Sequence, residues 1–137
     1  MEAKELMIDD WVLIDKPDKY AGAKAQIKSL RFHQKDDGQY FDVFICDSLG
    51  IARREVFNED LRPIPLTGEI LEKNGFKLDK EDGWWWLTPK IGITFWEEGF
   101  FELDIENKQS SVDIHINYLH QLQHALRLCG IEKEIEL

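Results

Sequence analysis

The chain has 137 residues, of which 43% are hydrophobic and 32% are charged, and its formal net charge is −10 at pH 7. A chain of this length forms one domain or two very small ones. The acidic balance disfavours binding to phosphate backbones and anionic membranes, and no apolar run approaches the about 20 residues of a membrane helix, so we expect neither partner.

Residues 1–66 have the pattern of a small β unit. Alternating or β-prone runs at 11–15, 23–33, 39–47 and 51–57 predict four strands, and KDDG supplies a turn between the second and the third. NEDLR at 58–62 predicts one helical turn, and two prolines keep the segment PIPL extended after it. Four or five short strands, with the segment after the helical turn as the last, and tight turns between them indicate a small SH3-like barrel, a fold that hosts many functions.

Residues 67–137 have an α+β pattern and carry a net charge of −7, against −3 for the first 66 residues. Thr67 and Gly75 are suitable caps for a short helix between them. Four strands of an antiparallel meander are then expected, within 82–89, 90–99, 100–105 and 111–116.

A last helix is predicted to begin after Asn117 and to end before Gly130. Its expected apolar face consists of Tyr118, Leu119, Leu122, Ala125, Leu126 and Cys129. The two cysteines, Cys46 and Cys129, lie in apolar contexts, so we expect buried thiols rather than a disulfide framework. The final IEKEIEL is either a short edge strand or a frayed tail.

His120 and His124 lie four residues apart in HQLQH, which is the helical spacing of a zinc site. In the hydrolase pattern H-E-x-x-H, however, a glutamate takes a proton from the zinc-bound water, and the amide of Gln121 cannot. A metal site would also need a third ligand, and nothing in the spacing forces His115, His33 or an acidic residue into that place. Both histidines of the pair fall opposite the apolar face, so we interpret them as surface residues and expect no metal there.

The run WWW is the other unusual feature. In a strand, Trp84 and Trp86 point to one face and Trp85 to the other. One interpretation is a core shared with the first half of the chain, because large aromatic side chains dominate cores. The alternative is an aromatic platform for another protein, for which the candidate partner-binding residues are Trp84, Trp86, Trp96 and Phe100. Base stacking is disfavoured, because the flanking segments KEDG and WEEG are acidic.

Three stretches, KELMIDDWVLID, RPIPLTGEILEKNGF and YLHQLQHALRLCGI, resemble a family of short uncharacterised proteins encoded by Bacteroides-group bacteria and by their phages and mobile elements. In that family they read like K-E-L-x-I-G-D-W-V, P-I-P-L-T-x-E-I-L-x-x-N-G-F and H-E-L-Q-H-A-L-R-L-C-G. The resemblance implies a genomic setting and no particular activity. Asp9 stands where glycine is typical of the family, and Gln121 where relatives often carry glutamate. Either an ancestral activity is lost here or the motif was never catalytic, and the adjoining packing stripe and cap in ALRLCG favour the second.

We therefore expect an α+β protein in which an SH3-like unit at 1–66 and a helix–meander–helix unit at 67–137 pack together through the tryptophans. The expected function is non-catalytic: a cytoplasmic accessory or interaction protein of a phage or mobile element that uses protein–protein contacts and no cofactor. The alternatives are a metal-dependent hydrolase built on His120 and His124, and an acidic decoy that imitates nucleic acid.

Overall fold

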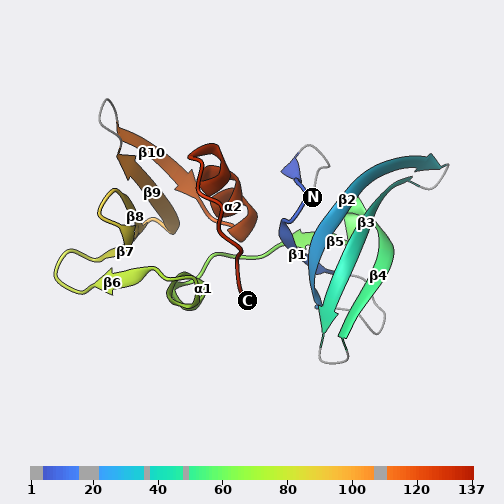
Figure 1. Cartoon of the computed structure of the whole chain (residues 1–137), viewed down its shortest axis with the longest axis horizontal. Helices are drawn as coiled ribbons and strands as arrows, with labels where there is room; N and C mark the ends of the chain where they lie inside the picture. Colours follow the sequence, from blue (N-terminus) through green and yellow to red (C-terminus); the bar gives the residue numbers. More distant parts are fainter. Residues whose placement is uncertain (1–4, 16–21, 36–37, 48–49, 107–110) are drawn as a thin grey trace. The chain divides into compact units, whose positions relative to one another are not determined.

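The computed structural model describes residues 5–15, 22–35, 38–47, 50–106 and 111–137 (Figure 1). The chain divides into two compact units, Met1–Ile64 and Pro65–Leu137. Each unit contains an antiparallel five-stranded sheet, and the helices α1 (Gly68–Lys73) and α2 (Leu119–Leu128) belong to the second, so the expected mixture of α and β structure is confirmed. Within the described ranges, no helix is long and apolar enough to cross a membrane.

The sheet of the first unit has the strand order β4-β3-β2-β1-β5. Its strands are β1 (Trp11–Ile14), β2 (Lys24–Lys35), β3 (Gly38–Asp47), β4 (Gly50–Phe57) and β5 (Leu61–Pro63), with a 3-10 turn at Asn58–Asp60 before β5. The predicted SH3-like barrel is not confirmed, because the sheet is not closed over the described residues: the three-residue β5 pairs with β1, and no described pairing joins it to β4. The core of this unit is aliphatic and consists of Leu6, Val12, Ile14, Ala25, Ile27, Val43, Val56 and Leu61.

The chain enters β1 through an unusual backbone conformation at Asp9. The φ angle of Asp9 is 71°, in the left-handed region that favours glycine. Hydrogen bonds on both sides hold the turn in place: the Asp9 N–H donates to the carbonyl of Ile27 at 2.6 Å, and the Asp10 carboxylate accepts from the Met7 N–H at 2.7 Å. Glycine at this position would adopt the same conformation without strain.

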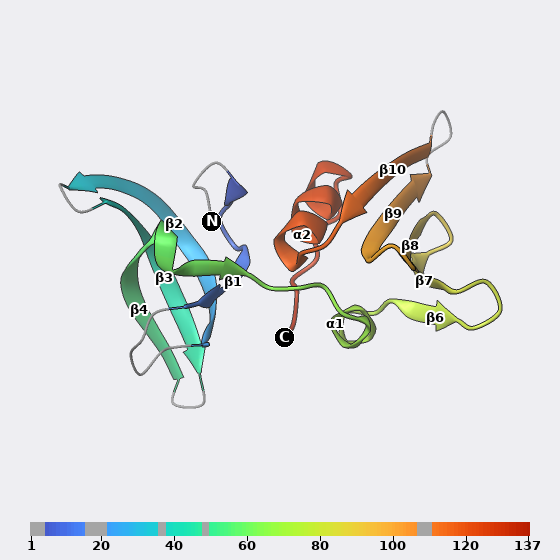
Figure 2. The same ribbon diagram turned by 180° about the vertical axis from the view of Figure 1, so that it is seen from behind.

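The sheet of the second unit is a meander with the strand order β10-β9-β8-β7-β6. Its strands are β6 (Lys77–Asp79), β7 (Trp84–Thr88), β8 (Ile91–Trp96), β9 (Phe100–Glu106) and β10 (Ser111–Ile116). The sequence predicted only four, because β6 is three exposed residues with no apolar alternation. From the front and from behind, α1 lies beside β6 and α2 beside β10 (Figure 1, Figure 2).

One face of this sheet forms the core of the unit with the two helices. Cross-strand register aligns Trp85, Ile93 and Leu103, and directly opposed residues share a face. A Cβ atom added to Gly68 in α1 would lie 3.0 Å from Cζ2 of Trp85, so this helix packs directly on that indole ring. Buried residues of the helices and the tail complete the core: Leu71, Leu119, Leu122, Ala125, Leu126 and Ile135.

The C-terminal segment is neither an edge strand nor a frayed tail. Residues 131–137 have no regular secondary structure, yet Ile135 is buried and the next residue is held by Asn74. The Asn74 amide nitrogen donates to the Glu136 carbonyl, and the Glu136 N–H donates to the Asn74 side-chain oxygen, both at 2.8 Å. The tail is thus attached to the end of α1 by a side chain that imitates a backbone pairing.

Candidate functional site on the second sheet

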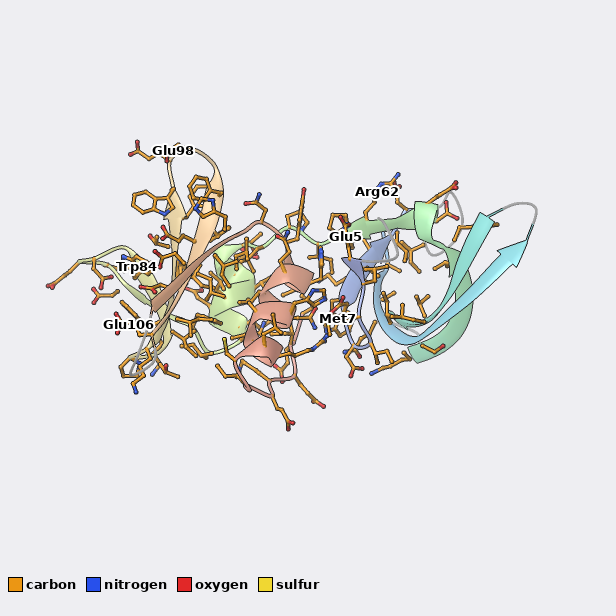
Figure 3. The ribbon with its side chains drawn as sticks, turned by 90° about the horizontal axis from the view of Figure 1, so that it is seen from above. Glu5, Met7, Arg62, Trp84, Glu98 and Glu106 are labelled. Atoms are coloured by element: carbon orange, nitrogen blue, oxygen red, sulfur yellow. The ribbon has the colours of Figure 1, made fainter. Side chains whose placement is uncertain are left out.

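The sheet face away from the helices collects the four aromatic residues singled out from the sequence. Register places Trp86 opposite Gly92 and Trp96 opposite Phe100, and side chains alternate along each strand. Trp84, Trp86, Trp96 and Phe100 therefore share one face, here called the aromatic face, and Trp85 lies on the other, which confirms the expected alternation of the WWW run. Figure 3 shows Trp84 on the side of the sheet opposite to both helices.

Trp84 and Trp86 form a stacked pair whose ring centroids are 5.6 Å apart, with an angle of 24° between the planes. Both rings lie on Gly92 of the neighbouring strand. A Cβ atom at Gly92 would lie 2.7 Å from Cζ3 of Trp86, closer than real contacts allow, and 3.1 Å from Cε3 of Trp84, tighter than most real contacts. The missing side chain of Gly92 thus lets the two indoles lie low across the sheet.

Carboxylates hold two of the indole N–H groups of the aromatic face. Nε1 of Trp86 donates to Asp82 at 3.2 Å, and Nε1 of Trp96 donates to Glu102 at 2.5 Å. Asp82 also accepts from the backbone N–H of Trp84 at 2.8 Å, so its carboxylate links the turn before β7 to the ring. Hydrogen bonds inside the unit therefore fix the orientation of the two indole rings. Their N–H groups already have acceptors.

Further carboxyl groups lie around the aromatic face. The register places these acidic residues on it: Asp79, Glu102, Asp104, Glu106 and Asp113. Lys77, opposite Trp86, is the one lysine or arginine on this face of the described strands. The face is accordingly both aromatic and strongly acidic.

Asp104 and Asp113 stand directly opposite each other on β9 and β10. One carboxylate oxygen of Asp104, Oδ1, is buried and has no hydrogen-bond partner among the described residues. Burial, and then the charge of Asp113 and a hydrogen bond with it, raise the pKa of Asp104 above its ordinary value, with smaller contributions from Glu106 and Glu102. The charged form of Asp104 is thus disfavoured at this position, beside a second carboxyl group.

His115 also belongs to this face, which the sequence did not reveal. Its ring stacks on Phe100 with centroids 4.3 Å apart and an angle of 28°. The alternation in FELDI and VDIHI already separates polar from apolar residues within each strand. It does not say which strand stands beside which, so the meeting of Asp104 with Asp113 and of Phe100 with His115 needed the register.

The histidine pair of α2 is arranged differently from the expectation. His120 is buried, with 5% of its surface exposed, so its assignment to the surface was wrong, whereas His124 is half-buried. The two ring centroids are 5.6 Å apart and the rings meet edge to face. The helix begins after Tyr118 rather than after Asn117, one residue later than expected. Gln121 is therefore its third residue.

Gln121 has a structural position at the start of α2. Its side-chain oxygen accepts from the backbone N–H of Asn117 at 2.8 Å and of Tyr118 at 3.1 Å. Glutamine and glutamate are both favoured at this third helical position, because either can cap the N-terminal N–H groups. A capping role therefore accounts for this position of the motif without any metal.

No group of three or more histidine, cysteine or acidic side chains in the described part of the chain is placed to hold a metal ion. Cys129 is exposed, contrary to the expectation of a buried thiol, and the side chain of Cys46 lies outside the described residues. Among the described residues, the aromatic face is where the unusual side chains of this unit gather, so it is the candidate site.

No protein-family model, curated protein or solved structure matches the chain. The fold and the site define its class: an α+β protein whose second antiparallel sheet has helices on one face and stacked aromatic and acidic side chains on the other.

Proposed function

We propose that the chain is a non-catalytic interaction protein that binds another protein through the aromatic face. The observation behind this proposal is that Trp84, Trp86, Trp96 and Phe100, from three strands, gather on the face away from the helices of the unit. Trp96 keeps 44% of its surface exposed. Exposed aromatic groups mark contact surfaces, and tryptophan is enriched among the residues that dominate binding energy.

The position of Gln121 supports a non-catalytic assignment over the metal-hydrolase alternative. An amide that caps a helix cannot take a proton from a metal-bound water. The resemblance of three stretches to proteins of phages and mobile elements adds the proposed setting, in which the partner is a protein of the bacterial cytoplasm.

A nucleic-acid decoy is the second candidate, favoured by the net charge of −10 and by the carboxylates on the sheet face. The two candidates differ in how they bind. A decoy binds basic proteins through charge, so its affinity falls steeply with salt and does not depend on the tryptophans. An aromatic contact tolerates salt and depends on them.

The test is affinity purification from a lysate of a Bacteroides-group host at low and high salt, followed by titration with the purified partner. Trp84→Ala/Trp86→Ala should abolish capture. Trp96→Ala should weaken the affinity by about tenfold or more, as for a contact hot spot. The matched control is Phe95→Ala, because Phe95 is the adjacent residue, is 56% exposed and lies on the other face.

Equal loss of affinity in the Trp96 and Phe95 variants would contradict the proposal. Salt-sensitive capture that is unchanged in both tryptophan variants would favour the decoy. If Trp84→Ala/Trp86→Ala is the one variant that loses cooperative unfolding, the two rings belong to the core of the unit. The comparison of Trp96→Ala with Phe95→Ala then decides whether the aromatic face binds a partner.

A further inference from the structure

We infer that the partner presents an extended, arginine-containing segment, and that one guanidinium group binds at Asp104 and Asp113 beside Trp86. The inference deepens the proposed function, since it names the chemistry that the aromatic face recognises. It rests on the arrangement of side chains across the sheet, on the kind of hydrogen bond that the face can still form, and on charge complementarity.

Trp86, Gly92, Asp104 and Asp113 form a continuous row across four strands. Neighbouring strands are about 4.8 Å apart, and the position between Trp86 and Asp104 carries no side chain. The Trp86 ring extends over that position, because it approaches the Cβ site of Gly92 to 2.7 Å. A group bound at the carboxyl pair therefore lies against the indole.

The face offers π surfaces and hydrogen-bond acceptors, and few donors. The N–H groups of Trp86 and Trp96 already donate to Asp82 and Glu102. What remains towards a ligand is the ring faces and the carboxylate oxygens, so the complementary ligand is a donor and a cation. A neutral oligosaccharide would stack on the rings, yet it would leave the acidic groups without a counter-charge.

Arginine fits this combination better than lysine. A guanidinium is planar, donates to carboxylates in a fork geometry and stacks on aromatic rings, whereas an ammonium is a strongly hydrated point charge. The exposed carboxylate of Asp113 offers acceptor oxygens at the surface, and the opposed Asp104, whose buried Oδ1 atom has no hydrogen-bond partner in the described structure, adds a second negative group beside it. A guanidinium supplies a counter-charge to this opposed pair of carboxyl groups.

The carboxyl groups of Glu102 and Glu106 flank Asp104 on the same face of β9, and Lys77 lies at the far end of the row, beyond Trp86. These additional carboxylates around the guanidinium position can pair with further basic residues of the bound segment. A strand-like segment exposes alternate side chains to the sheet, so basic residues two apart face the aromatic face together.

The test is a tryptophan-fluorescence titration of the full chain with three eight-residue peptides. They alternate serine with arginine, with lysine, or with citrulline, which keeps the shape of arginine without its charge. We expect the arginine peptide to bind about tenfold or more tightly than citrulline and several-fold more tightly than lysine.

Asp104→Asn/Asp113→Asn should weaken binding of the arginine peptide about tenfold or more. The matched control is Glu132→Gln/Glu134→Gln, which changes the net charge equally at exposed residues of the C-terminal segment and should leave the affinity within about twofold. Removal of the opposed charges should not unfold the sheet, so a loss of affinity reports the contact itself.

Equal weakening in both double variants, equal affinity for arginine and citrulline, or no binding of the arginine peptide would overturn the inference. A cello-oligosaccharide that binds through the tryptophans without any peptide binding would do the same. The proposed function would survive if a partner without a basic segment bound with the Trp96 dependence described above. It would fail only if no protein partner showed that dependence.

Discussion

The side-chain amide of Asn74 and the backbone of Glu136 exchange two hydrogen bonds, although 62 residues separate them. Asn74 is 3% exposed and its amide nitrogen also donates to the Ile70 carbonyl at 2.8 Å. Its side chain thus joins the end of α1 to the C-terminal segment inside the unit.

Asn74→Ala should lower the free energy of unfolding of the second unit by about 2–3 kcal/mol, because it leaves buried backbone groups without their partners. Chemical denaturation followed by tryptophan fluorescence measures this. Glu136→Ala is the matched control and should change stability by less than about 0.5 kcal/mol, because only the backbone of Glu136 takes part. A similar loss of stability in both variants would show that the exposed side chain of Glu136, and not its backbone pairing with Asn74, stabilises the unit.

Gln121→Ala should lower the stability of the second unit by about 1 kcal/mol, because two N–H groups at the start of α2 lose their acceptor. Gln121→Glu should retain most of the stability, because a carboxylate caps the same groups and suits the helix dipole. Thermal unfolding by circular dichroism gives both values.

Gln121→Glu also completes H-E-x-x-H, and it should neither bind zinc stoichiometrically nor gain peptidase activity. Zinc content after dialysis of untagged protein checks the first point and cleavage of a casein substrate the second. Stoichiometric zinc that disappears in His124→Ala would contradict the capping interpretation.

Asp9→Gly should be more stable than Asp9→Ala by about 1 kcal/mol, because glycine adopts a φ of 71° without strain and alanine does not. The comparison with alanine matters, since both variants lose the exposed ion pair of Asp9 with Lys28 at 2.7 Å. Urea denaturation of the two variants side by side measures the difference. Equal stability would mean that the turn relaxes to negative φ.

The stability of the second unit should fall as pH rises above 3.8, the ordinary pKa of aspartic acid, through the raised pKa of Asp104. The sign follows from proton binding: the folded state holds the proton at pH values where the unfolded state has lost it, so raising the pH favours unfolding. The groups that face Asp104 and disfavour its charge are Asp113, Glu106 and Glu102.

Asp104→Asn should flatten this pH dependence and stabilise the unit by about 0.5 kcal/mol at neutral pH, because two opposed like charges become one. Denaturation curves from about pH 4 to about pH 7 test both effects. Glu132→Gln, in the C-terminal segment, is the control and should keep the wild-type slope. A slope unchanged by Asp104→Asn would assign the pH dependence to other groups.

Gly92→Ala should disturb the stacked pair Trp84–Trp86 without removing either ring, because the added methyl would meet Cζ3 of Trp86 at 2.7 Å. The expected signature is loss of the exciton band that two coupled indoles give in far-ultraviolet circular dichroism. Gly99→Ala is the control for an added methyl without neighbours within 4 Å; its φ of 97° strains alanine, so this variant should lose stability but keep that band. An unchanged exciton band in Gly92→Ala would mean that the band does not come from the Trp84–Trp86 pair at Gly92.

Local features were predictable from the sequence wherever the residues that determine them lie within one short stretch. Gly75 and Gly130 end the two helices with φ of 89° and 74°, as their positions in the sequence indicated. The split of the WWW run between two faces followed from the two-residue period of a strand. β6 was missed for the converse reason: its three residues are exposed, and pairing with β7 alone makes them a strand.

The sequence by itself determined the charge, the α+β class, the alternation of the tryptophans and the glycines that end the two helices, because each depends on composition or on residues within one or two turns. The tertiary structure alone decided three things. The sheet of the first unit stays open, His120 is buried, and Asp104 meets Asp113 beside a glycine covered by Trp86. These depend on strand register and packing, which are set by the summed free energy of contacts between distant residues that no local pattern records.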